Sequence, residues 1–503
     1  MSLMSAPLGA VIIGASRQRH RINRRRWKFA RGPVRGSSNT PVDGVIYPYF
    51  VAHPITLVTR GHEAPDHSIT AHLGESMTAR SSRRPLRGLV AFMATVSAFT
   101  VGYSSSSSAW AADFPTAVVN TTGLAVTDTV VTVGQLHSST GTMAISETGS
   151  IEAERLAIKQ INDMGGVLGR KIEVIYEDGA SDWPTFAEKA KKLLIKDKVG
   201  TVFGCWTSAS RKAVLPIFEK ENGLLYYPTF YEGLEASKNV IYTGQEATQQ
   251  IIWGLNWAAK EKGAKTYFLI GSDYIWPRTS NKIARIHIEK HLTDSKVVGE
   301  EYKPLGDTDF GSLINKIKLA KPDVIFAAVV GGSNVAWYKQ LKAAGITGES
   351  LAKKNRLLLT ISTTEDEIRG IGGENVEGFF ACMKYFQSLT NDNNVKFIAA
   401  FKELYKDKYG DKPVVGDVTQ AAYLGPWLWK AAVEKCGSFD IDKITAASPD
   451  IEFKDAPEGY VKIHKNHHLW SKARIGKMKA DGQFEIVAES DLIEPNPFPE
   501  GYK

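Results

Sequence analysis

The stretch VGTVFGCWTSASRKAVLPIFEKENGLLYYPTF, residues 199–230, decides the fold class. It begins with a short β-branched run at residues 199–203, continues through an amphipathic segment, and ends with a second apolar run at residues 224–227. Short apolar strands that alternate with longer amphipathic helices are typical of a parallel sheet covered by helices. The stretch therefore predicts one β-α-β unit of an α/β protein.

The same alternation extends in both directions from this unit, starting at residue 129. Ile151, Ile158 and Ile161 recur at helical spacing and mark the buried face of the first predicted helix. The interval 242–250 separates two sets of four strands, which predicts two doubly wound, Rossmann-like lobes joined by a hinge. The eight predicted strands are residues 130–136, 172–176, 199–203, 224–227, 266–270, 297–300, 324–329 and 357–361.

The carboxyl-terminal third of the chain completes both lobes. An apolar run at 376–385 and helices near 395–409 and 420–435 predict a return to the first lobe. Beyond residue 449, short alternating segments and the turn dipeptide Asp481-Gly482 predict a small antiparallel appendage of the second lobe. The predicted boundaries are 129–246 plus 376–448 for lobe 1, and 247–375 plus 449–503 for lobe 2.

The net charge of +8 is confined to the amino-terminal part of the chain. Residues 1–112 hold 14 Lys and Arg against 4 Asp and Glu, whereas residues 113–503 hold 48 against 50. The remainder of the chain is therefore close to neutral, and the basic composition does not indicate a nucleic-acid partner.

Residues 77–112 have the order of a secretory signal peptide. Arginines precede the apolar run 89–101, and the small residues around Ala111 follow it. We expect cleavage near Ala111, and the pair Arg83-Arg84 leaves both general secretion and twin-arginine export open. Residues 1–76 are then an amino-terminal extension or precede the true start, for which Met77 is the preferred initiator. No later apolar run is long enough to span a bilayer, so the predicted location is the periplasm.

The residues that follow the predicted strands are the candidate ligand site. Ligands of open α/β sheets bind beyond the carboxyl ends of the strands. Hydroxyl and aromatic side chains dominate these positions, and Lys and Arg do not cluster there. Such a set suits a small uncharged polar solute, because a phosphate or dicarboxylate calls for cationic partners. The set comprises Ser138, Ser139, Trp206, Thr207, Ser208, Tyr227, Thr229, Phe230, Tyr231, Tyr274, Trp276, Thr363 and Thr364.

Several of these positions also admit purely structural roles. Ser208 could cap a helix that begins near Ala209. Tyr227, Tyr231 and Tyr274 could be half-buried aromatics at strand ends. The histidines at 464, 467 and 468 lack an acidic or cysteine partner at metal-site spacing, so no metal or other cofactor is predicted. Three cysteines are too few for a disulfide framework.

Five motifs carry a family resemblance: GCWTSASRKAVLP (204–216), YYPTFYEG (226–233), GSDYIWPRTSN (271–281), KPDVIF (321–326) and NHHLWSKARIGKM (466–478). Together they resemble the urea and short-chain amide receptors within the branched-chain amino acid type of periplasmic binding protein, over about residues 129–490. The resemblance implies a type I fold, in which two lobes joined by three crossovers close on the ligand. It also implies the permease and ATPase subunits of an ABC transporter as partners.

The resemblance further implies a set of ligand-binding residues. Among them, an acidic group at Asp417 would discriminate urea from acetamide, although an aspartate before a helix can also be an N-cap. At residues 229–230, 329–331 and 363–364 the chain is closer to the aliphatic-amide sensors, so urea and a short amide such as formamide or acetamide both remain candidates, with a branched-chain amino acid as a further alternative. The implied residues are Trp206, Ser208, Tyr227, Thr229, Tyr274, Trp276, Val330, Thr364 and Asp417.

Two other functions are less consistent with the sequence. An amidohydrolase needs a metal site or an activated nucleophile with a base, and neither spacing is present. A cytosolic amide sensor of the same fold conflicts with the predicted signal peptide. The sequence therefore predicts a non-enzymatic, exported receptor.

Overall fold

The computed structural model describes residues 114–410, 412 and 414–502. All of these residues belong to one compact unit. The predicted extension at 1–76 and signal peptide at 77–112 lie outside the described residues. In the part of the chain that the structure describes, no helix has both the length and the hydropathy to cross a membrane.

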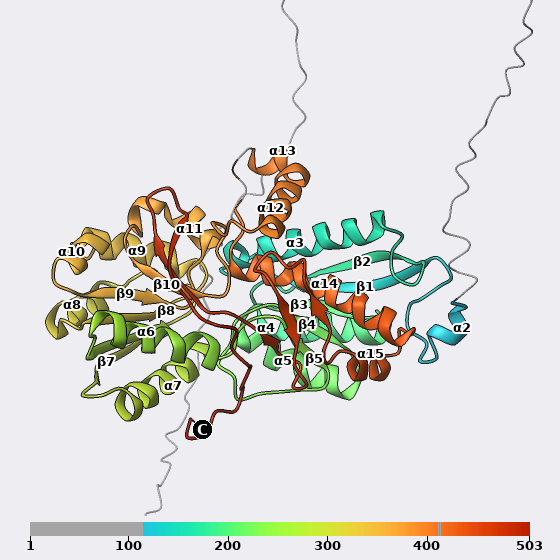
Figure 1. The fold of residues 1–503 in the computed structure, drawn as a ribbon, viewed down its shortest axis with the longest axis horizontal. Helices are drawn as coiled ribbons and strands as arrows, with labels where there is room; N and C mark the ends of the chain where they lie inside the picture. Colours follow the sequence, from blue (N-terminus) through green and yellow to red (C-terminus); the bar gives the residue numbers. More distant parts are fainter. Residues whose placement is uncertain (1–113, 411, 413, 503) are drawn as a thin grey trace, which may run out of the picture. The chain divides into compact units, whose positions relative to one another are not determined.

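The first lobe is built on a five-stranded parallel sheet with the order β2-β1-β3-β4-β5 (Figure 1). β-branched and aromatic residues fill most of β1, β3, β4 and β5 and are buried on both faces, as expected for a sheet between helix layers, whereas the edge strand β2 is charged and partly exposed. Its strands are β1 (Val130–His137), β2 (Lys171–Asp178), β3 (Val202–Gly204), β4 (Leu225–Tyr227) and β5 (Val240–Tyr242).

The second lobe is built on a seven-stranded sheet with the order β15-β14-β10-β9-β8-β6-β7. The segment β7-β6-β8-β9-β10 is parallel and repeats the doubly wound order of the first lobe, and the antiparallel strands β14 and β15 extend it. Its strands are β6 (Thr266–Ser272), β7 (Lys296–Lys303), β8 (Val324–Ala328), β9 (Leu357–Thr360), β10 (Phe380–Met383), β14 (Arg474–Met478) and β15 (Phe484–Glu489).

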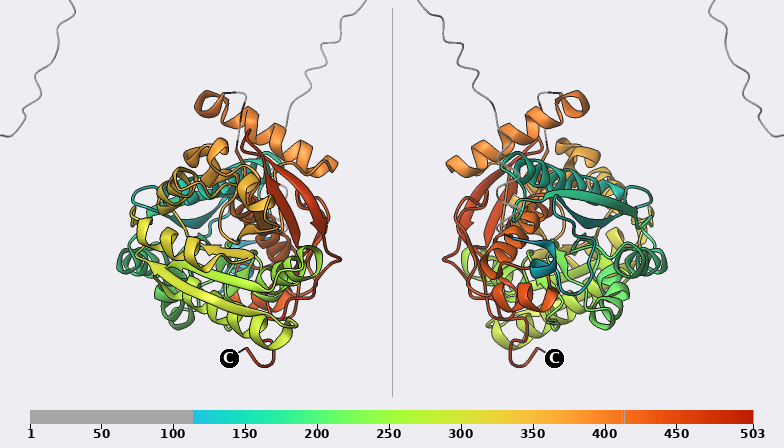
Figure 2. Two further views of the ribbon diagram at one scale, coloured as in Figure 1. Left: turned by 90° about the vertical axis from the view of Figure 1, so that its left-hand side faces the viewer. Right: turned by 90° about the vertical axis from the view of Figure 1, so that its right-hand side faces the viewer.

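Helices cover both faces of each sheet (Figure 1, Figure 2). Around the first sheet lie α2 (Thr116–Val119), α3 (Ala144–Asp163), α4 (Trp183–Lys191), the π-helix η1 (Lys192–Lys196), α5 (Ser208–Lys220), α12 (Asp392–Leu404), α13 (Lys406–Tyr409), α14 (Asp417–Cys436) and α15 (Ile441–Ala447). Around the second lie the π-helix η2 (Thr248–Ile252), α6 (Trp253–Lys262), α7 (Ile275–His291), α8 (Gly311–Ala320), α9 (Ser333–Ala343), α10 (Gly348–Ala352), α11 (Glu365–Ile371) and the 3-10 turn η3 (Gly373–Asn375).

The chain passes between the two sheets three times. It leaves the first sheet after β5, returns after β10, and crosses again between β13 and β14. A small antiparallel sheet precedes the third passage and joins the first lobe through the bridge between Tyr242 and His468. Its strands are β11 (Glu452–Phe453), β12 (Val461–Ile463) and β13 (Leu469–Trp470).

The eight predicted strands all occur, with shifts of a few residues at their ends. Two features differ from the predicted organisation. The run that contains β10 was expected to open the return to lobe 1, but β10 pairs with β9 and β14 in the second sheet. The strands β11–β13, expected in lobe 2, pack their apolar side chains into the core of lobe 1. In both cases the local pattern predicts a strand correctly but carries no information about which sheet that strand joins.

The two lobes are in contact across their shared face. Gly332 N–H in lobe 2 donates to the Thr142 carbonyl oxygen in lobe 1 at 2.9 Å. Asp366, on α11, accepts hydrogen bonds from Gly416 N–H at 2.9 Å and Thr419 Oγ1 at 2.7 Å. Because α11 also packs against α3, the structure shows the lobes closed on each other.

A carboxyl-terminal strap, residues 493–502, runs along both lobes near the crossovers. Ile493 pairs with Ser471, and the Pro497 carbonyl accepts from Leu234 N–H of lobe 1 at 2.7 Å. At its other end the Tyr502 hydroxyl lies 2.7 Å from His287 Nδ1 on α7 of lobe 2. The strap therefore adds a connection between the lobes beyond the three crossovers (Figure 1).

Candidate functional site

The candidate site lies where the strand order reverses in each sheet. In both lobes this topological switch point falls between the first and third strands, β1 and β3 or β6 and β8. Ligands of doubly wound sheets bind beyond the strand ends at that position. Trp206 and Ser208 follow β3, whereas Tyr274 follows β6 and Val330 follows β8. The predicted residues therefore come from equivalent positions of the two lobes.

A chain of three aromatic rings joins the lobes at this position. The ring centroids of Trp206 and Phe230, both of lobe 1, are 5.6 Å apart in an edge-on arrangement. Phe230 in turn lies 5.4 Å from Trp276, which belongs to α7 of lobe 2. Both indoles are 2% exposed, so the rings form a dry contact between the lobes. This apolar contact is continuous with the buried core of each lobe.

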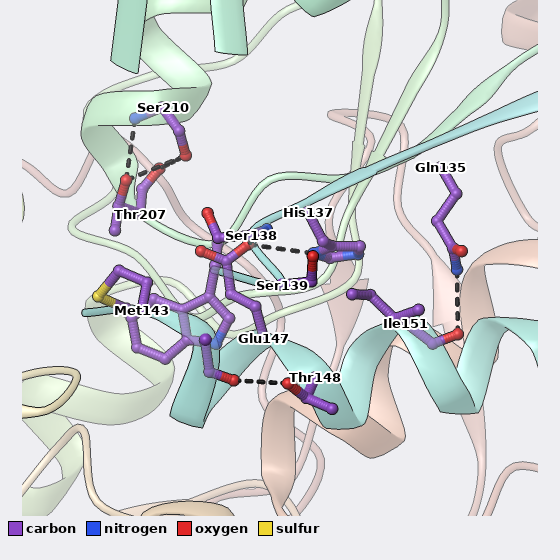
Figure 3. A network of polar contacts seen from close by, with 12 residues as sticks. Gln135, His137, Ser138, Ser139, Met143, Glu147, Thr148, Ile151, Thr207 and Ser210 are labelled. Carbon is purple, nitrogen blue, oxygen red and sulfur yellow. Dashed lines mark hydrogen bonds and ion pairs between the residues drawn. The ribbon is translucent and has the colours of Figure 1, made fainter. Parts of the chain in front are cut away.

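Ser208 is the first residue of α5 and is held in a buried polar cluster. Its Oγ donates to Glu232 Oε2 at 2.6 Å and accepts from Arg211 Nη1 at 3.1 Å. The alternative role as a helix cap is wrong for Ser208, because the helix begins one residue earlier than expected. Thr207 is the N-cap, and its Oγ1 accepts from Ser210 N–H at 3.0 Å (Figure 3).

Arg211 is a buried cation beside the predicted site and was not among the predicted site residues. Its Nε donates to Glu235 at 2.7 Å, and Glu232 lies 3.5 Å from its Nη2. Its guanidinium also lies 4.6 Å from the ring centroid of Tyr227. Burial alone would raise the pKa of Glu235, but Arg211 and Lys212 lower it to about 2. The charge of Arg211 is thus already matched by carboxylates.

Tyr227, Thr229 and Tyr274 border the same region. The Tyr227 hydroxyl donates to the Trp206 carbonyl oxygen at 2.7 Å, which ties the end of β4 to the loop after β3. Thr229 is 1% exposed. Burial raises the pKa of the Tyr274 phenol well above its usual value. The Tyr274 ring centroid lies 6.1 Å from that of Trp183 on α4, so Tyr274 faces lobe 1 across the junction.

The remaining three predicted residues are placed differently. Val330 is buried, and its N–H donates to Ser272 Oγ at 3.1 Å next to the junction with Thr142. Thr364 and Asp417 lie in a separate cluster with α11. Asp417 Oδ2 accepts from the backbone N–H groups of Lys384 and Tyr385, each at 3.0 Å. In the described part of the chain, no hydrogen bond or ring contact joins Thr364 or Asp417 to the aromatic group.

Several buried polar atoms in the aromatic group have no hydrogen bond to any residue that the structure describes. They are Trp206 Nε1, Trp276 Nε1, Thr229 Oγ1, and the two atoms Arg211 Nη2 and Glu232 Oε1, which lie 3.5 Å apart as an ion pair. Leaving a buried donor or acceptor unsatisfied costs about 1–3 kcal/mol each. Such atoms, donors and acceptors drawn from both lobes, are suited to a small ligand that carries both kinds of group.

A buried histidine between two glutamates lies behind this region, and the sequence analysis did not assign it a role. His137 Nε2 is 2.9 Å from Glu154 Oε1, and His137 Nδ1 is 3.4 Å from Glu147 Oε2. Burial alone would lower the pKa of His137, but Glu154 and Glu147 raise it to about 9. The imidazole is therefore protonated at neutral pH. Figure 3 shows Glu147 between His137 and Met143 at the start of α3.

An open groove elsewhere on lobe 2 does not coincide with the predicted residues. It has a volume of about 570 Å³ and lies between α6 and β15, where Trp257 and Phe380 line it. None of the nine predicted residues lines this groove. The candidate site is thus the closed junction between the lobes.

Comparison with known proteins identifies the class. A family model described as "Periplasmic binding protein domain" matches residues 131–503, which is most of the chain. The chain therefore belongs to the periplasmic binding protein family, and the predicted type I fold is confirmed. Within this family it is a binding protein for a small solute.

The chain is similar to several named proteins. Leu/Ile/Val-binding protein homolog 7 of Brucella suis is 24% identical over 381 residues, which cover 73% of this chain and 93% of that protein. A solute-binding protein of an ABC transporter from R. palustris, solved in complex with 4-hydroxybenzoate, is 22% identical with a TM-score of 0.64, covering 74% of this chain and all of that one. A limonene hydroxylase of Geobacillus stearothermophilus is 33% identical over 125 residues, and the match covers 25% of this chain and 22% of that protein's length.

Proposed function

We propose that this protein is the extracytoplasmic substrate-binding subunit of an ABC transporter and that it binds urea between its two lobes. The membrane permease and its ATPase would be its partners, and the periplasm its location. The predicted signal peptide supports export, and the relatives of the same fold include solute-binding proteins of ABC transporters. A single arrangement of polar atoms at the lobe junction carries the assignment of the ligand.

That arrangement is the set of buried polar atoms without hydrogen bonds around the rings of Trp206, Phe230 and Trp276. Urea has one carbonyl acceptor and four N–H donors. The two indole N–H groups, one from each lobe, suit the carbonyl oxygen. Thr229 Oγ1 and Glu232 Oε1 suit the amino groups. The flat faces of the rings suit a planar amide.

The charges at the junction favour an uncharged ligand over a carboxylate. Ligands such as leucine or 4-hydroxybenzoate carry a carboxylate, which calls for a cation or for several free donors. The buried cation beside the site, Arg211, already faces Glu232 and Glu235. A carboxylate placed here would also meet the negative charges of those glutamates. We therefore rank a branched-chain amino acid below an amide.

The choice between urea and a short aliphatic amide depends on Thr364 and Asp417. Asp417 is fully buried, and its Oδ1 makes no hydrogen bond to the described residues. Asp417 lies in the separate cluster with α11, so in the proposed role the ligand sits between that cluster and the aromatic group, and this oxygen accepts from its second amino group. Acetamide carries a methyl group there, which leaves the acceptor unpaired and weakens binding. Formamide and acetamide remain the alternative ligands of the same site.

The proposed role is binding without chemical change. Burial raises the pKa of the Cys205 thiol, the thiol next to the site, and the nearby Glu147 adds to the rise. A thiol with a raised pKa is a poor nucleophile at neutral pH. This supports a receptor over an amidohydrolase.

Calorimetric titration of the purified protein with urea, formamide, acetamide and leucine tests the proposal. We expect saturable binding of urea, weaker binding of acetamide and no binding of leucine. Trp276→Phe, which removes one indole N–H, should weaken urea binding by about tenfold, equivalent to about 1.4 kcal/mol. Trp429→Phe is the matched control, because Trp429 is equally buried and its Nε1 also lacks a hydrogen bond, but it lies in the core of lobe 1. A preference for leucine would refute the ligand assignment.

A further inference from the structure

Glu147 occupies a position at the lobe junction that the proposed ligand set does not include. It lies in the first turn of α3 and is 1% exposed. The residues just before α3 touch lobe 2: the Thr142 carbonyl accepts from Gly332 N–H, and a Cβ atom on Gly331 would lie 2.8 Å from Met143 Sδ. Glu147 is therefore buried at the junction, not deep inside lobe 1.

One oxygen of the Glu147 carboxylate has a partner among the described residues. Oε2 accepts from Ser138 N–H at 2.7 Å and lies 3.4 Å from His137 Nδ1. Within the described residues, Oε1 makes no hydrogen bond. Holding one oxygen of a buried carboxylate in this way fixes the orientation of the side chain and leaves the second oxygen as an unfilled acceptor.

Glu147 also acts electrostatically on groups of both lobes. Burial raises the pKa of the Tyr274 phenol, and Glu147 is among the groups that add to the rise, together with Tyr227 and Glu232. Glu147 also raises the pKa of the Cys205 thiol, which immediately precedes Trp206. Met143, four residues before Glu147, touches Gly331 of lobe 2, and Ser138 N–H holds the carboxylate beside the end of β1, so Glu147 lies at the boundary between the lobes.

We propose that Glu147 is a further ligand-binding residue, whose Oε1 accepts a hydrogen bond from an N–H group of the bound amide. This inference rests on the proposed function, because it assumes an N–H-bearing ligand at the lobe junction. It also narrows the class of ligand. A carboxylate oxygen at this position accepts hydrogen bonds and repels a second carboxylate, so it favours a ligand with N–H donors over an acidic ligand.

The test compares Glu147→Gln with the wild type by calorimetric titration of urea, formamide and acetamide. The glutamine amide oxygen would accept from Ser138 N–H, so the amide nitrogen would present a donor to the N–H of the ligand. We expect the affinity for the best-bound amide to fall at least about thirtyfold. Glu152→Gln is the matched control, since Glu152 is on the same helix, is 5% exposed, and contacts Tyr409 away from the junction. It should change the affinity less than threefold.

A second measurement does not depend on the folding of any variant. A crystal structure of the wild type with its amide should place Glu147 Oε1 within hydrogen-bond distance, about 3.2 Å, of a ligand nitrogen. A ligand nitrogen beyond this distance, or an unchanged affinity in Glu147→Gln while the wild type binds an amide, overturns the role of Glu147 and leaves the proposed function intact. If the wild type binds none of the three amides, both the proposed function and this inference fail.

Discussion

Gly331 of lobe 2 lies against Met143 of lobe 1, so closely that a Cβ atom on Gly331 would be 2.8 Å from Met143 Sδ. The same Cβ atom would be 2.8 Å from the Thr142 carbonyl oxygen, which is fixed backbone. The junction between the lobes therefore has no room for a side chain at residue 331. Since the candidate ligand residues come from both lobes, any change that prevents this approach should weaken binding.

Gly331→Ala should reduce the affinity for the bound solute by about tenfold or more. The added methyl group would collide with Met143 and Thr142 and keep the two lobes from closing fully. Gly345→Ala is the matched control. Both glycines have a positive φ, +62° and +76°, so both substitutions introduce similar backbone strain, but a Cβ atom on Gly345 meets nothing within 4 Å. Titration calorimetry of both variants checks this. Equal losses in the two variants would show that strain, not closure, causes the effect.

Asp417→Asn should weaken urea more than acetamide. The substitution keeps an oxygen for the N–H groups of Lys384 and Tyr385 and turns the free Oδ1 position into a donor. Urea would present an N–H group to that donor, whereas acetamide would present a methyl group. We expect the ratio of the urea and acetamide affinities to fall by about tenfold, equivalent to about 1.4 kcal/mol. Equal losses for both ligands would count against a discriminating role for Asp417.

Asp366→Asn should flatten the dependence of stability on pH. Burial raises the pKa of Asp366 to about 7, and Glu367 adds to the rise. The folded state therefore holds this proton more tightly than the unfolded state, so stability is greatest at low pH and falls as the pH rises through about 7. The wild type should lose about 1–3 kcal/mol more than Asp366→Asn between pH 5 and pH 8.

Unfolding by guanidinium chloride at both pH values measures this difference. Urea is unsuitable as the denaturant because it is the proposed ligand. Asp442→Asn serves as the control, since the Asp442 side chain is 70% exposed and pairs only with Lys238 and Asn222 at the surface. If the free energy of unfolding changes equally between the two pH values in Asp366→Asn and the wild type, the Asp366 carboxyl does not titrate in this range.

Tyr502→Phe should lower the free energy of unfolding by about 1 kcal/mol, the usual value of one buried hydrogen bond. The lost bond is that between the Tyr502 hydroxyl and His287 Nδ1. Burial lowers the pKa of His287 to about 4, so the neutral ring can accept this bond at neutral pH. Tyr460→Phe is a suitable control, because its hydroxyl bonds to Glu452 at the surface. A similar small loss in both variants would show that the end of the strap is not held by this bond.

Much of the fold could be predicted from local patterns, because parallel strands between helices have a distinctive alternation of apolar runs. β5 (Val240–Tyr242) was not predicted as a strand, because no helix lies between it and β4 and the alternation of strands and helices is interrupted there. The placement of β10 and β11–β13 depends on pairing between distant segments. Sequence alternation does not encode such pairing.

The candidate site was predictable only in part. Hydroxyl and aromatic residues at strand ends could be found from their position, and the structure brings Trp206 and Trp276 together through Phe230. Glu147 and Arg211 were missed because charged residues on a helix are normally exposed. His137 is the last residue of β1, and its role appears only in the fold, where Glu147 and Glu154 of α3 lie on its two ring nitrogens.

The ring contact between the lobes makes the intrinsic tryptophan fluorescence of the protein sensitive to the opening of the lobes. Trp206 and Trp276 are on opposite lobes, and Phe230 separates them. Opening of the lobes would bring water to both indoles at once, and indole emission shifts to longer wavelength in a polar environment. Solute binding could therefore be followed in real time on the unlabelled protein, by the emission wavelength of its tryptophan fluorescence.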